Sequence, residues 1–304
     1  MSEIGKAVEI LKSGGLVAFP TETVYGLGAD ATNDLAVAKI YAAKGRPTFN
    51  PLIGHVVDVE AAIELTEFSG DALKLAMRFW QGPLTLVLPR KLNCPVSLLA
   101  SAGLGSLALR VPAHPSALEL LRAFGGPIVA PSANPSGRIS PTTAQHVRDG
   151  LGDKVELILD GGPCAVGLES TIVSLLDEHP RLLRAGGLAR EEIEEVLGRF
   201  LLSATAGPLH APGQLESHYA PQATMRLDAR QWRDGEARLG FGTYDAPLNL
   251  SQRGDVVEAA ANLFSMLHQL DADGATTIAV APIPNIGIGE AINDRLMRAA
   301  APRD

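Results

Sequence analysis

Hydroxyl and cationic side chains gather in residues 16–55, where they could bind a small anion. Thr21 and Thr23 follow an apolar run, and Lys44 and Arg46 follow a helical pattern. Hydroxyls and backbone N–H groups donate to phosphate or carboxylate oxygens, and an arginine can bind such a group through two parallel hydrogen bonds. A strand, a polar turn, a helix and cations in this order are typical of an α/β site for a small anionic ligand. We therefore expect the rest of the chain to close around this stretch.

Residues of the same types recur where later apolar runs end. They are Asn50, His55, Ser106, Arg110, Ser132, Asn134, Ser140, Ser170, Thr171 and Arg184. Strand ends in an α/β sheet converge on a crevice, so these side chains are candidates for one site. Arg110 and Arg184 are the most informative of them, because each ends an apolar strand where a cation has no packing role.

Each candidate also has an ordinary structural explanation. The two threonines could cap local backbone groups, and a single histidine in a strand, such as His55, is commonly structural. Gly45 and Pro47 end the helical pattern, which predicts that Lys44 and Arg46 lie at an exposed helix end and complement its dipole. The joint pattern is more informative than its members, although composition alone does not name the ligand.

Several familiar catalytic motifs are absent from the sequence. It contains no GxxxxGK[ST], HExxH or GxSxG, and Gly287-Ile-Gly289 lacks the third glycine of a dinucleotide-binding loop. A P-loop NTPase, a nucleotide-dependent dehydrogenase and a serine hydrolase therefore have no motif support. Cys94 and Cys164 form no CxxC, so neither a zinc knuckle nor a redox pair is indicated, and a reducing cytosol fits.

Length and composition limit the class of protein. The chain has 304 residues, 46% hydrophobic and 20% charged, which is typical of a globular protein with two domains. A net charge of -8 argues against a general polyanion binder, and 5% aromatic residues argue against a base-stacking surface. We expect neither a signal peptide nor a membrane span, because the start reads as an amphipathic helix and no run of about 18 apolar residues occurs.

Hydrophobic periodicity places the candidates on an α/β framework. A polar glycine turn is expected over 20–28. Helices are expected over 3–12, 33–44, 59–79, 115–124 and 189–197, with a short one from Thr142 or Thr143, and strands over 16–19, 51–57, 84–89, 103–111, 127–130, 155–160, 170–176 and 181–184. Several neighbouring strands lack a helix between them, so we expect a mixed sheet with flanking helices.

The composition changes after residue 203. Residues 204–221 lack a hydrophobic period at first and are expected to form a linker, which separates a first domain of residues 1–203 from a second of residues 222–304. In the second domain we expect strands over 225–227, 238–241 and 277–282 and helices over 256–270 and 291–300. That pattern predicts a smaller α/β unit.

Six motifs in order resemble the YrdC/Sua5 family. They are FPTETVYGLG (19–28), KGR (44–46) with NP (50–51), SLALRVP (106–112), PSAN (131–134) and EST (169–171). SHYAP (217–221) and GIGEAINDRL (287–296) are similar to the long Sua5 form, which carries a Rossmann-like C-terminal domain. The resemblance implies a YrdC-like twisted mixed sheet for the first domain.

The resemblance also implies an activity, that of a threonylcarbamoyl-AMP synthase. Such an enzyme is a nucleotidyltransferase that converts L-threonine, bicarbonate and ATP into threonylcarbamoyl-AMP, diphosphate and water, for the t6A modification at position 37 of tRNA. By motif position, the family implies that Thr23, His55, Arg110, Ala130 and Ser170 contact threonine. It implies that Lys44, Arg46, Asn50, Ser106, Ser132, Ser140, Arg184 and Tyr219 contact ATP, with Lys44 and Arg46 as the catalytic cations and Tyr219 folding over the site from the linker.

Cofactor and partners follow from the same resemblance. We expect Mg²⁺ to be held mainly by the ATP phosphates, because the sequence shows no acidic cluster with metal spacing. The implied partners are proteins that transfer the threonylcarbamoyl group to tRNA in the cytoplasm, and a weak contact with tRNA is left open. Two alternatives remain, a carbamoyl-transfer module and a non-catalytic RNA-binding protein, of which the net charge disfavours the second.

Overall fold

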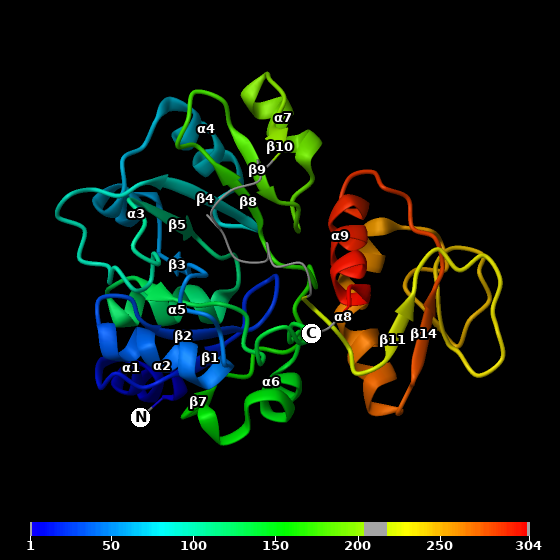
Figure 1. Cartoon of the computed structure of the whole chain (residues 1–304). Helices are drawn as coiled ribbons and strands as arrows, with labels where there is room; N and C mark the ends of the chain where they lie inside the picture. The colour runs from blue at the N-terminus through cyan, green and yellow to red at the C-terminus, as the bar shows by residue number, and fades with distance from the viewer. Residues whose placement is uncertain (1, 204–217, 303–304) are drawn as a thin grey trace.

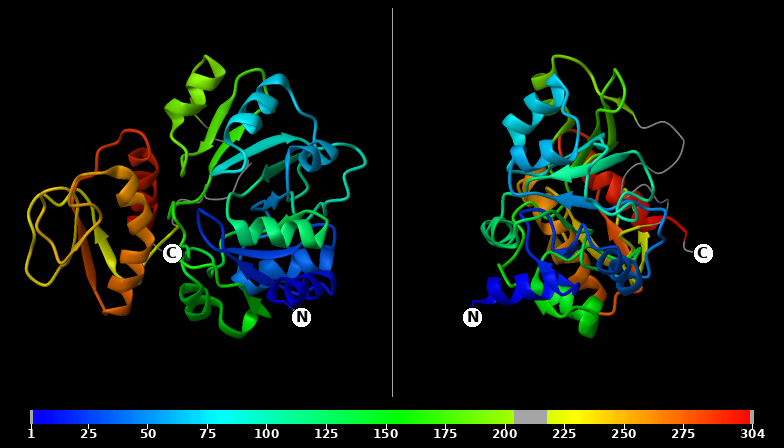
Figure 2. Two further views of the ribbon diagram at one scale, coloured as in Figure 1. Left: turned by 180° about the vertical axis from the view of Figure 1, so that it is seen from behind. Right: turned by 90° about the vertical axis from the view of Figure 1, so that its left-hand side faces the viewer.

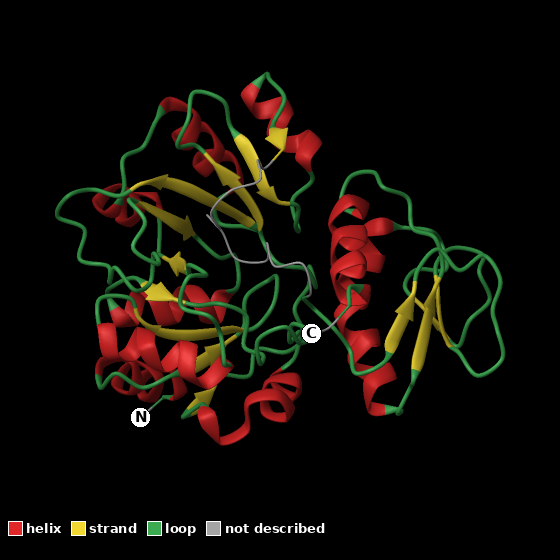
Figure 3. Cartoon of the chain, viewed as in Figure 1, coloured by secondary structure: helices red, strands yellow, loops and turns green. Residues whose placement is uncertain are grey.

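The computed structural model describes residues 2–203, here called the N-terminal part, and residues 218–302, the C-terminal part. Each part contains one β-sheet with flanking helices (Figures 1 and 3). The helices of the N-terminal part are α1 (Glu3–Lys12), α2 (Asp34–Lys44), α3 (Val59–Leu65), α4 (Gly70–Phe79), α5 (Pro115–Phe124), α6 (Ala144–Leu151) and α7 (Arg190–Leu197), with a 3-10 turn at Gly152–Lys154.

The sheet of the N-terminal part is mixed, as the sequence predicts. Its strands are β1 (Val17–Phe19), β2 (Gly26–Asp30), β3 (Ile53–His55), β4 (Leu84–Pro89), β5 (Ser106–Arg110), β6 (Ile128–Val129), β7 (Leu157–Ile158), β8 (Thr171–Ser174), β9 (Arg181–Arg184) and β10 (Leu202–Ser203). They lie in the order β10-β9-β8-β4-β5-β3-β6-β2-β1-β7. β3 and β5 pair in parallel with His55 opposite Arg110, whereas β4 and β5 are antiparallel. Two candidate side chains thus share one register position.

The C-terminal part is a smaller, parallel α/β unit. It consists of β11 (Thr224–Arg226), β12 (Ala237–Gly240), β13 (Leu248–Asn249), α8 (Val256–Ala272), β14 (Thr277–Val280) and α9 (Gly289–Ala300). The strand order is β11-β14-β12-β13, with all pairs parallel. Helices α8 and α9 lie between this sheet and the N-terminal part (Figures 1 and 2). Side chains of α8 and α9 can therefore reach the N-terminal part.

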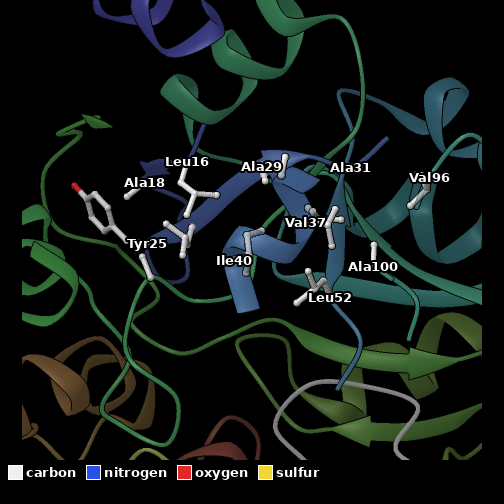
Figure 4. Close-up of a cluster of buried hydrophobic side chains, with 14 of the residues drawn as sticks. Leu16, Ala18, Tyr25, Ala29, Ala31, Val37, Ile40, Leu52, Val96 and Ala100 are labelled. Carbon is white, nitrogen blue, oxygen red and sulfur yellow. The ribbon is translucent and has the colours of Figure 1, made fainter. Parts of the chain in front are cut away.

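Helix α2 shows how local sequence and core packing agree. Asn33 caps its first turn by accepting the N–H groups of Leu35 and Ala36, and Gly45 ends it with a left-handed φ of 61°. Its inner face packs into the main core with residues of the first strands and of the loop before β5 (Figure 4). This packing fixes the C-terminal end of α2, where Lys44 is the last residue and Arg46 follows.

Several predicted elements need correction. The predicted turn over 20–28 ends in a strand, β2, whose glycines serve close packing: a Cβ on Gly28 would lie 2.8 Å from Phe19 Cε1. The predicted helix over 59–79 is two helices, because Thr66 leaves the helical conformation and Ser69 caps a new one at Ala72 N–H. The short strands β10 and β13 were not predicted.

The remaining fold predictions have different outcomes. Of the predicted linker, residues 204–217 lie outside the described part of the chain, so the domain boundaries stay a prediction. Among residues 2–203 and 218–302, no helix combines the length and apolar character that a membrane span requires.

Candidate functional site

Strand ends and loops of the N-terminal part surround a small cavity of about 40 Å³. Nine of the residues predicted for the site line it: Thr23, Arg46, His55, Arg110, Ala130, Ser132, Ser170, Arg184 and Tyr219. They come from the β1–β2 loop, the end of α2, five strands or strand ends, and the segment after residue 217. A volume of this size holds only a few water molecules.

Arg110 is the most fully organised cation of the cavity. Its Nε donates to Gly82 O at 3.1 Å, its Nη1 to Thr23 Oγ1 at 2.8 Å, and its Nη2 to Glu22 Oε1 at 2.5 Å. The other oxygen of Glu22 accepts the N–H of Ala113. Since three of five guanidinium donors are held by protein, the remaining two are presented in a fixed geometry that suits a carboxylate.

The β1–β2 loop supplies hydroxyls in a fixed arrangement. Thr21 Oγ1 lies 2.8 Å from Thr23 Oγ1, donates to Val24 O and accepts the N–H groups of Thr23 and Val24. Thr21 is thus the local cap that its ordinary structural explanation predicts, whereas Thr23 also faces Arg110. The loop holds its second hydroxyl in place for a ligand.

Lys44 and Arg46 correct one prediction, because neither is exposed. Their exposures are 4% and 7%. Lys44 Nζ donates to Ser132 O at 2.6 Å and to Asn134 O at 2.5 Å, and Arg46 Nη2 donates to Pro51 O at 3.1 Å. Carbonyls of later loops fold over the end of α2, which periodicity within the helix cannot reveal.

Burial makes these cations sensitive to a nearby anion. Burial, with the charge of Arg46 second, holds the pKa of Lys44 well below its usual range. Burial likewise lowers the pKa of Arg46 to about 10. An anionic ligand would oppose both shifts, so the pocket favours negative charge at this end.

Arg184 and Ser170 contact each other in the wall of the cavity. Arg184 donates from Nε and Nη2 to Ser170 O, at 3.2 and 2.9 Å, and Ser170 Oγ lies 2.7 Å from Thr85 Oγ1. The guanidinium at the end of β9 is therefore oriented by the strand beside it. Both residues line the cavity.

Four predicted residues are not in the wall of the cavity. They are Lys44, Asn50, Ser106 and Ser140. Ser140 lies behind the wall, where its hydroxyl donates to Glu169 Oε1 at 2.5 Å. Asn50 is buried, and neither amide atom has a hydrogen-bond partner among the described residues. Its polar atoms are thus available to a ligand that enters beside Arg46.

Three functional residues were missed by sequence reasoning. Glu169 and His218 line the cavity, and Glu22 orients Arg110. Each lies next to a predicted residue in the chain, in the strings TET, EST and SHY. One signal could have found the two glutamates. Several cations buried in one site need acidic partners, and both glutamates lie beside predicted site residues.

The C-terminal part closes one side of the cavity through Tyr219. This side chain is 1% exposed, and its ring stacks with Phe264 at a centroid distance of 5.7 Å. Its φ of 63° is unusual for tyrosine, which indicates that packing on both sides determines the conformation. The next residue, Ala220, donates its N–H to Gly137 O of the N-terminal part. Tyr219 therefore lines the cavity from the C-terminal part, while its contact with ATP stays a prediction.

Two buried histidines give a testable pH dependence. Burial, with the charge of Arg110 second, lowers the pKa of His55 to about 3, and burial lowers the pKa of His218 to about 3. Both stay neutral in the folded protein but gain a proton on unfolding below about pH 6.5. The free energy of unfolding should therefore fall as pH drops from about 6.5 towards 3, by up to about 1.4 kcal/mol per pH unit for each histidine.

Urea unfolding at several pH values between about 7 and 5 measures this slope. His55→Gln should reduce the slope by about one proton, and His179→Gln, in an exposed turn outside the site, is the matched control. Equal slopes for wild type and His55→Gln would show that His55 does not stay neutral in the folded protein.

Within the ranges that the structure describes, no group of three or more His, Cys, Asp or Glu side chains could hold a metal ion. The polar groups of the cavity are instead mainly cations and hydroxyls. Such a set suits phosphate and carboxylate oxygens.

Comparisons with known proteins agree with this geometry. The Sua5/YciO/YrdC family model, described as "Telomere recombination", matches residues 9–186, and a model described as "Threonylcarbamoyl-AMP synthase, C-terminal domain" matches residues 188–301. A threonylcarbamoyl-AMP synthase of Bacillus subtilis is 41% identical, over 99% of this chain and 94% of that protein. One of Pyrococcus abyssi is 41% identical, over 98% and 94%.

A solved structure extends the comparison to three dimensions. The crystal structure of P. abyssi Sua5 complexed with L-threonine has a TM-score of 0.90 and 40% identity, covering 99% of this chain and 95% of that one. The likeness includes both sheets, since it spans nearly the whole of both chains. This chain therefore belongs to the YrdC/Sua5 family, in the form that carries the Sua5 C-terminal region.

Proposed function

We propose that this protein is a threonylcarbamoyl-AMP synthase, a nucleotidyltransferase that uses L-threonine, bicarbonate and ATP. The observation that carries the proposal is that one cavity brings together Arg110, Thr23 and His55, which we assign to threonine, and the cations Arg46 and Arg184, which we assign to ATP. The names of the relatives, and the threonine bound in the P. abyssi structure, support the same assignment.

The half-site around Arg110 is assigned to threonine. The two free donors of Arg110 bind the carboxylate, and Thr23 and Ser170 offer hydroxyls to its polar groups. His55 stays neutral and packs edge-on against Phe19 at 5.9 Å, so it adds no charge that would compete with Arg110. Ala130 completes the wall with a small apolar surface.

The half-site around Arg46 is assigned to ATP. Bicarbonate and the threonine amine first give a carbamate and water; a carbamate oxygen then attacks the α-phosphorus, and diphosphate leaves. Negative charge increases on the phosphoryl oxygens, so fixed cations stabilise the transition state more than an acid or base would. Lys44, Arg46 and Arg184 supply these cations, with Asn50, Ser106, Ser132 and Ser140 as the proposed polar contacts. Mg²⁺ held by the phosphates would add charge neutralisation there.

The segment at His218 and Tyr219 is assigned to closure of the site. Both side chains line the cavity, so their movement would change access to it. A carbamate is labile in water, which makes closure after binding useful. One solved P. abyssi Sua5 structure is of a variant with alanine in place of a histidine and the following tyrosine, and its TM-score to this chain is 0.89. His218–Tyr219 is the sole His-Tyr pair in the present sequence.

The direct test is pyrophosphate release by the purified full-length protein with ATP, bicarbonate and Mg²⁺. Release should depend on threonine, and omission of bicarbonate should abolish it, because both atoms of the new carbamate linkage come from these substrates. Serine and valine are the matched controls for the amino acid. The product of the reaction would supply the proteins that transfer the threonylcarbamoyl group to tRNA. If pyrophosphate release does not depend on threonine, the assignment is wrong, and the alternatives are again a carbamoyl-transfer module and an RNA-binding protein.

A further inference from the structure

Arg295 of α9 reaches from the C-terminal part to the wall of the cavity. It is 1% exposed, and its Nε donates to Glu169 Oε2 at 2.9 Å. A second nitrogen, Nη1, donates to the neighbouring Asp294 at 2.7 Å. An arginine buried this completely requires an ionic partner, and Glu169, itself 6% exposed, supplies it across the contact of the two parts.

Glu169 connects Arg295 to the proposed nucleotide side of the cavity. One carboxylate oxygen accepts from Arg295, and the other accepts the Ser140 hydroxyl at 2.5 Å. Burial alone would raise the pKa of Glu169, but the charges of Arg295 and Arg184 outweigh it, so its pKa lies below its usual value. The ionised carboxylate can thus hold Ser140 in one rotamer.

Arg295 also contacts the closing residue. Its guanidinium carbon lies 5.0 Å from the centre of the Tyr219 ring, within the range of a cation–π interaction. The same ring stacks with Phe264 of α8. Phe264 and Arg295 both belong to the C-terminal part, and Arg295 also reaches Glu169.

We propose that Arg295 is a positioning residue for the reaction, which sets the nucleotide half of the cavity by holding Glu169 on one side and Tyr219 on the other. The inference rests on the proposed function, because it assigns ATP to that half. It gives the C-terminal part a direct role in the site: without Arg295, the Ser140–Glu169 pair and the Tyr219 ring each lose one of their supports. In the threonine half, the hydrogen bonds described for Arg110, Glu22 and Thr23 do not involve Arg295 or Glu169, so threonine binding should change little.

A second ion pair between the two parts provides a matched control. Arg190 at the start of α7 donates to both oxygens of Glu290 on α9, at 3.1 and 2.6 Å. These side chains are 25% and 30% exposed, and neither residue lines the cavity. Breaking this pair loosens the same contact of the two parts but leaves Glu169 and Tyr219 supported.

The test compares Arg295→Met, Arg295→Lys and Arg190→Met in the full-length protein. For Arg295→Met we expect the KM for ATP to rise about tenfold, with the KM for threonine within about twofold of wild type. Arg295→Lys should recover part of the loss, because it restores the charge but not the forked geometry. Arg190→Met should leave both constants unchanged. Equal losses for Arg295→Met and Arg190→Met, or equal changes for both substrates, would overturn the positioning role.

A double-mutant cycle with Glu169→Gln tests the route of the effect. If Arg295 acts through Glu169, the double variant should lose little more ATP affinity than either single variant, whereas independent effects would multiply. ATP affinity is also measured by calorimetry, without turnover. This separates the two proposals: a wild-type protein that binds ATP but releases no threonine-dependent pyrophosphate refutes the function, while unchanged ATP affinity in Arg295→Met refutes the positioning role.

Discussion

Replacing Arg110 with alanine is expected to lower kcat/KM for threonine by about 100- to 10,000-fold. Two charge-assisted hydrogen bonds to a carboxylate contribute roughly 1.5–3 kcal/mol each, and about 1.4 kcal/mol corresponds to a factor of ten. The substitution also leaves Glu22, whose side chain is 12% exposed, without its ionic partner. Both effects act on the threonine half of the cavity, because the cations proposed for ATP lie elsewhere.

The measurement is pyrophosphate release with threonine varied and ATP saturating. Arg110→Lys keeps a charge but not the fork, so it should retain only part of the activity. Glu22→Gln is the control for misplacement: it leaves the guanidinium present but removes the ion pair, so it should raise the KM for threonine less than Arg110→Ala does. Thermal unfolding of each variant separates loss of binding from loss of folding. An unchanged KM for threonine in Arg110→Ala would refute its assigned role.

The sequence predicts this site better than it predicts the surroundings of each residue. Arg110 and Arg184 end apolar strands, and that local pattern was sufficient to place both in the cavity. The burial of Lys44 was not predictable in this way, because its partners are carbonyls of residues 132 and 134, far along the chain. Hydrophobic periodicity predicts which face of a single helix or strand is buried. Contacts such as those of Lys44 depend instead on which strands become neighbours in the fold.

The same distinction explains the errors in the fold. Ser69 and Thr66 interrupt the 59–79 helix because a cap and a bridge to Arg90 replace continued helix, and the apolar spacing runs across the break. The glycines of β2 have the composition of a turn, but their role is to let Phe19 and Ile128 approach the strand. In both cases the deciding contact lies in another element, so local sequence favours the wrong assignment.

The role proposed for Glu169 depends on a contact between residues that are far apart in the sequence. Its chain neighbour Ser170 was predicted from the strand end, but the acid itself acquires a role only through Arg295, 126 residues later. A scan of motifs treats these residues as two separate strings. The structure makes them one contact between the two parts of the chain, and this contact lies beside Tyr219, the residue that we propose closes the site.

Replacing that closing residue, Tyr219, with alanine is expected to reduce kcat/KM by about 100-fold and to uncouple the reaction. The ring fills one side of the cavity and packs on Phe264, so its loss admits water to a site where a labile carbamate must survive. Tyr219→Phe keeps the ring and should retain most of the activity, which makes it the matched control. The left-handed backbone at this position is common to both variants, so strain does not distinguish them.

The informative measurement is the ratio of threonylcarbamoyl-AMP formed to pyrophosphate released. In wild type the two should be nearly equal, whereas in Tyr219→Ala pyrophosphate should exceed the adenylate, because water competes with the carbamate for the α-phosphorus. A lower rate with an unchanged ratio would show that Tyr219 supports binding but does not exclude water. Wild-type rate and ratio together would refute the closing role, and the role of the C-terminal part would then rest on Arg295 alone.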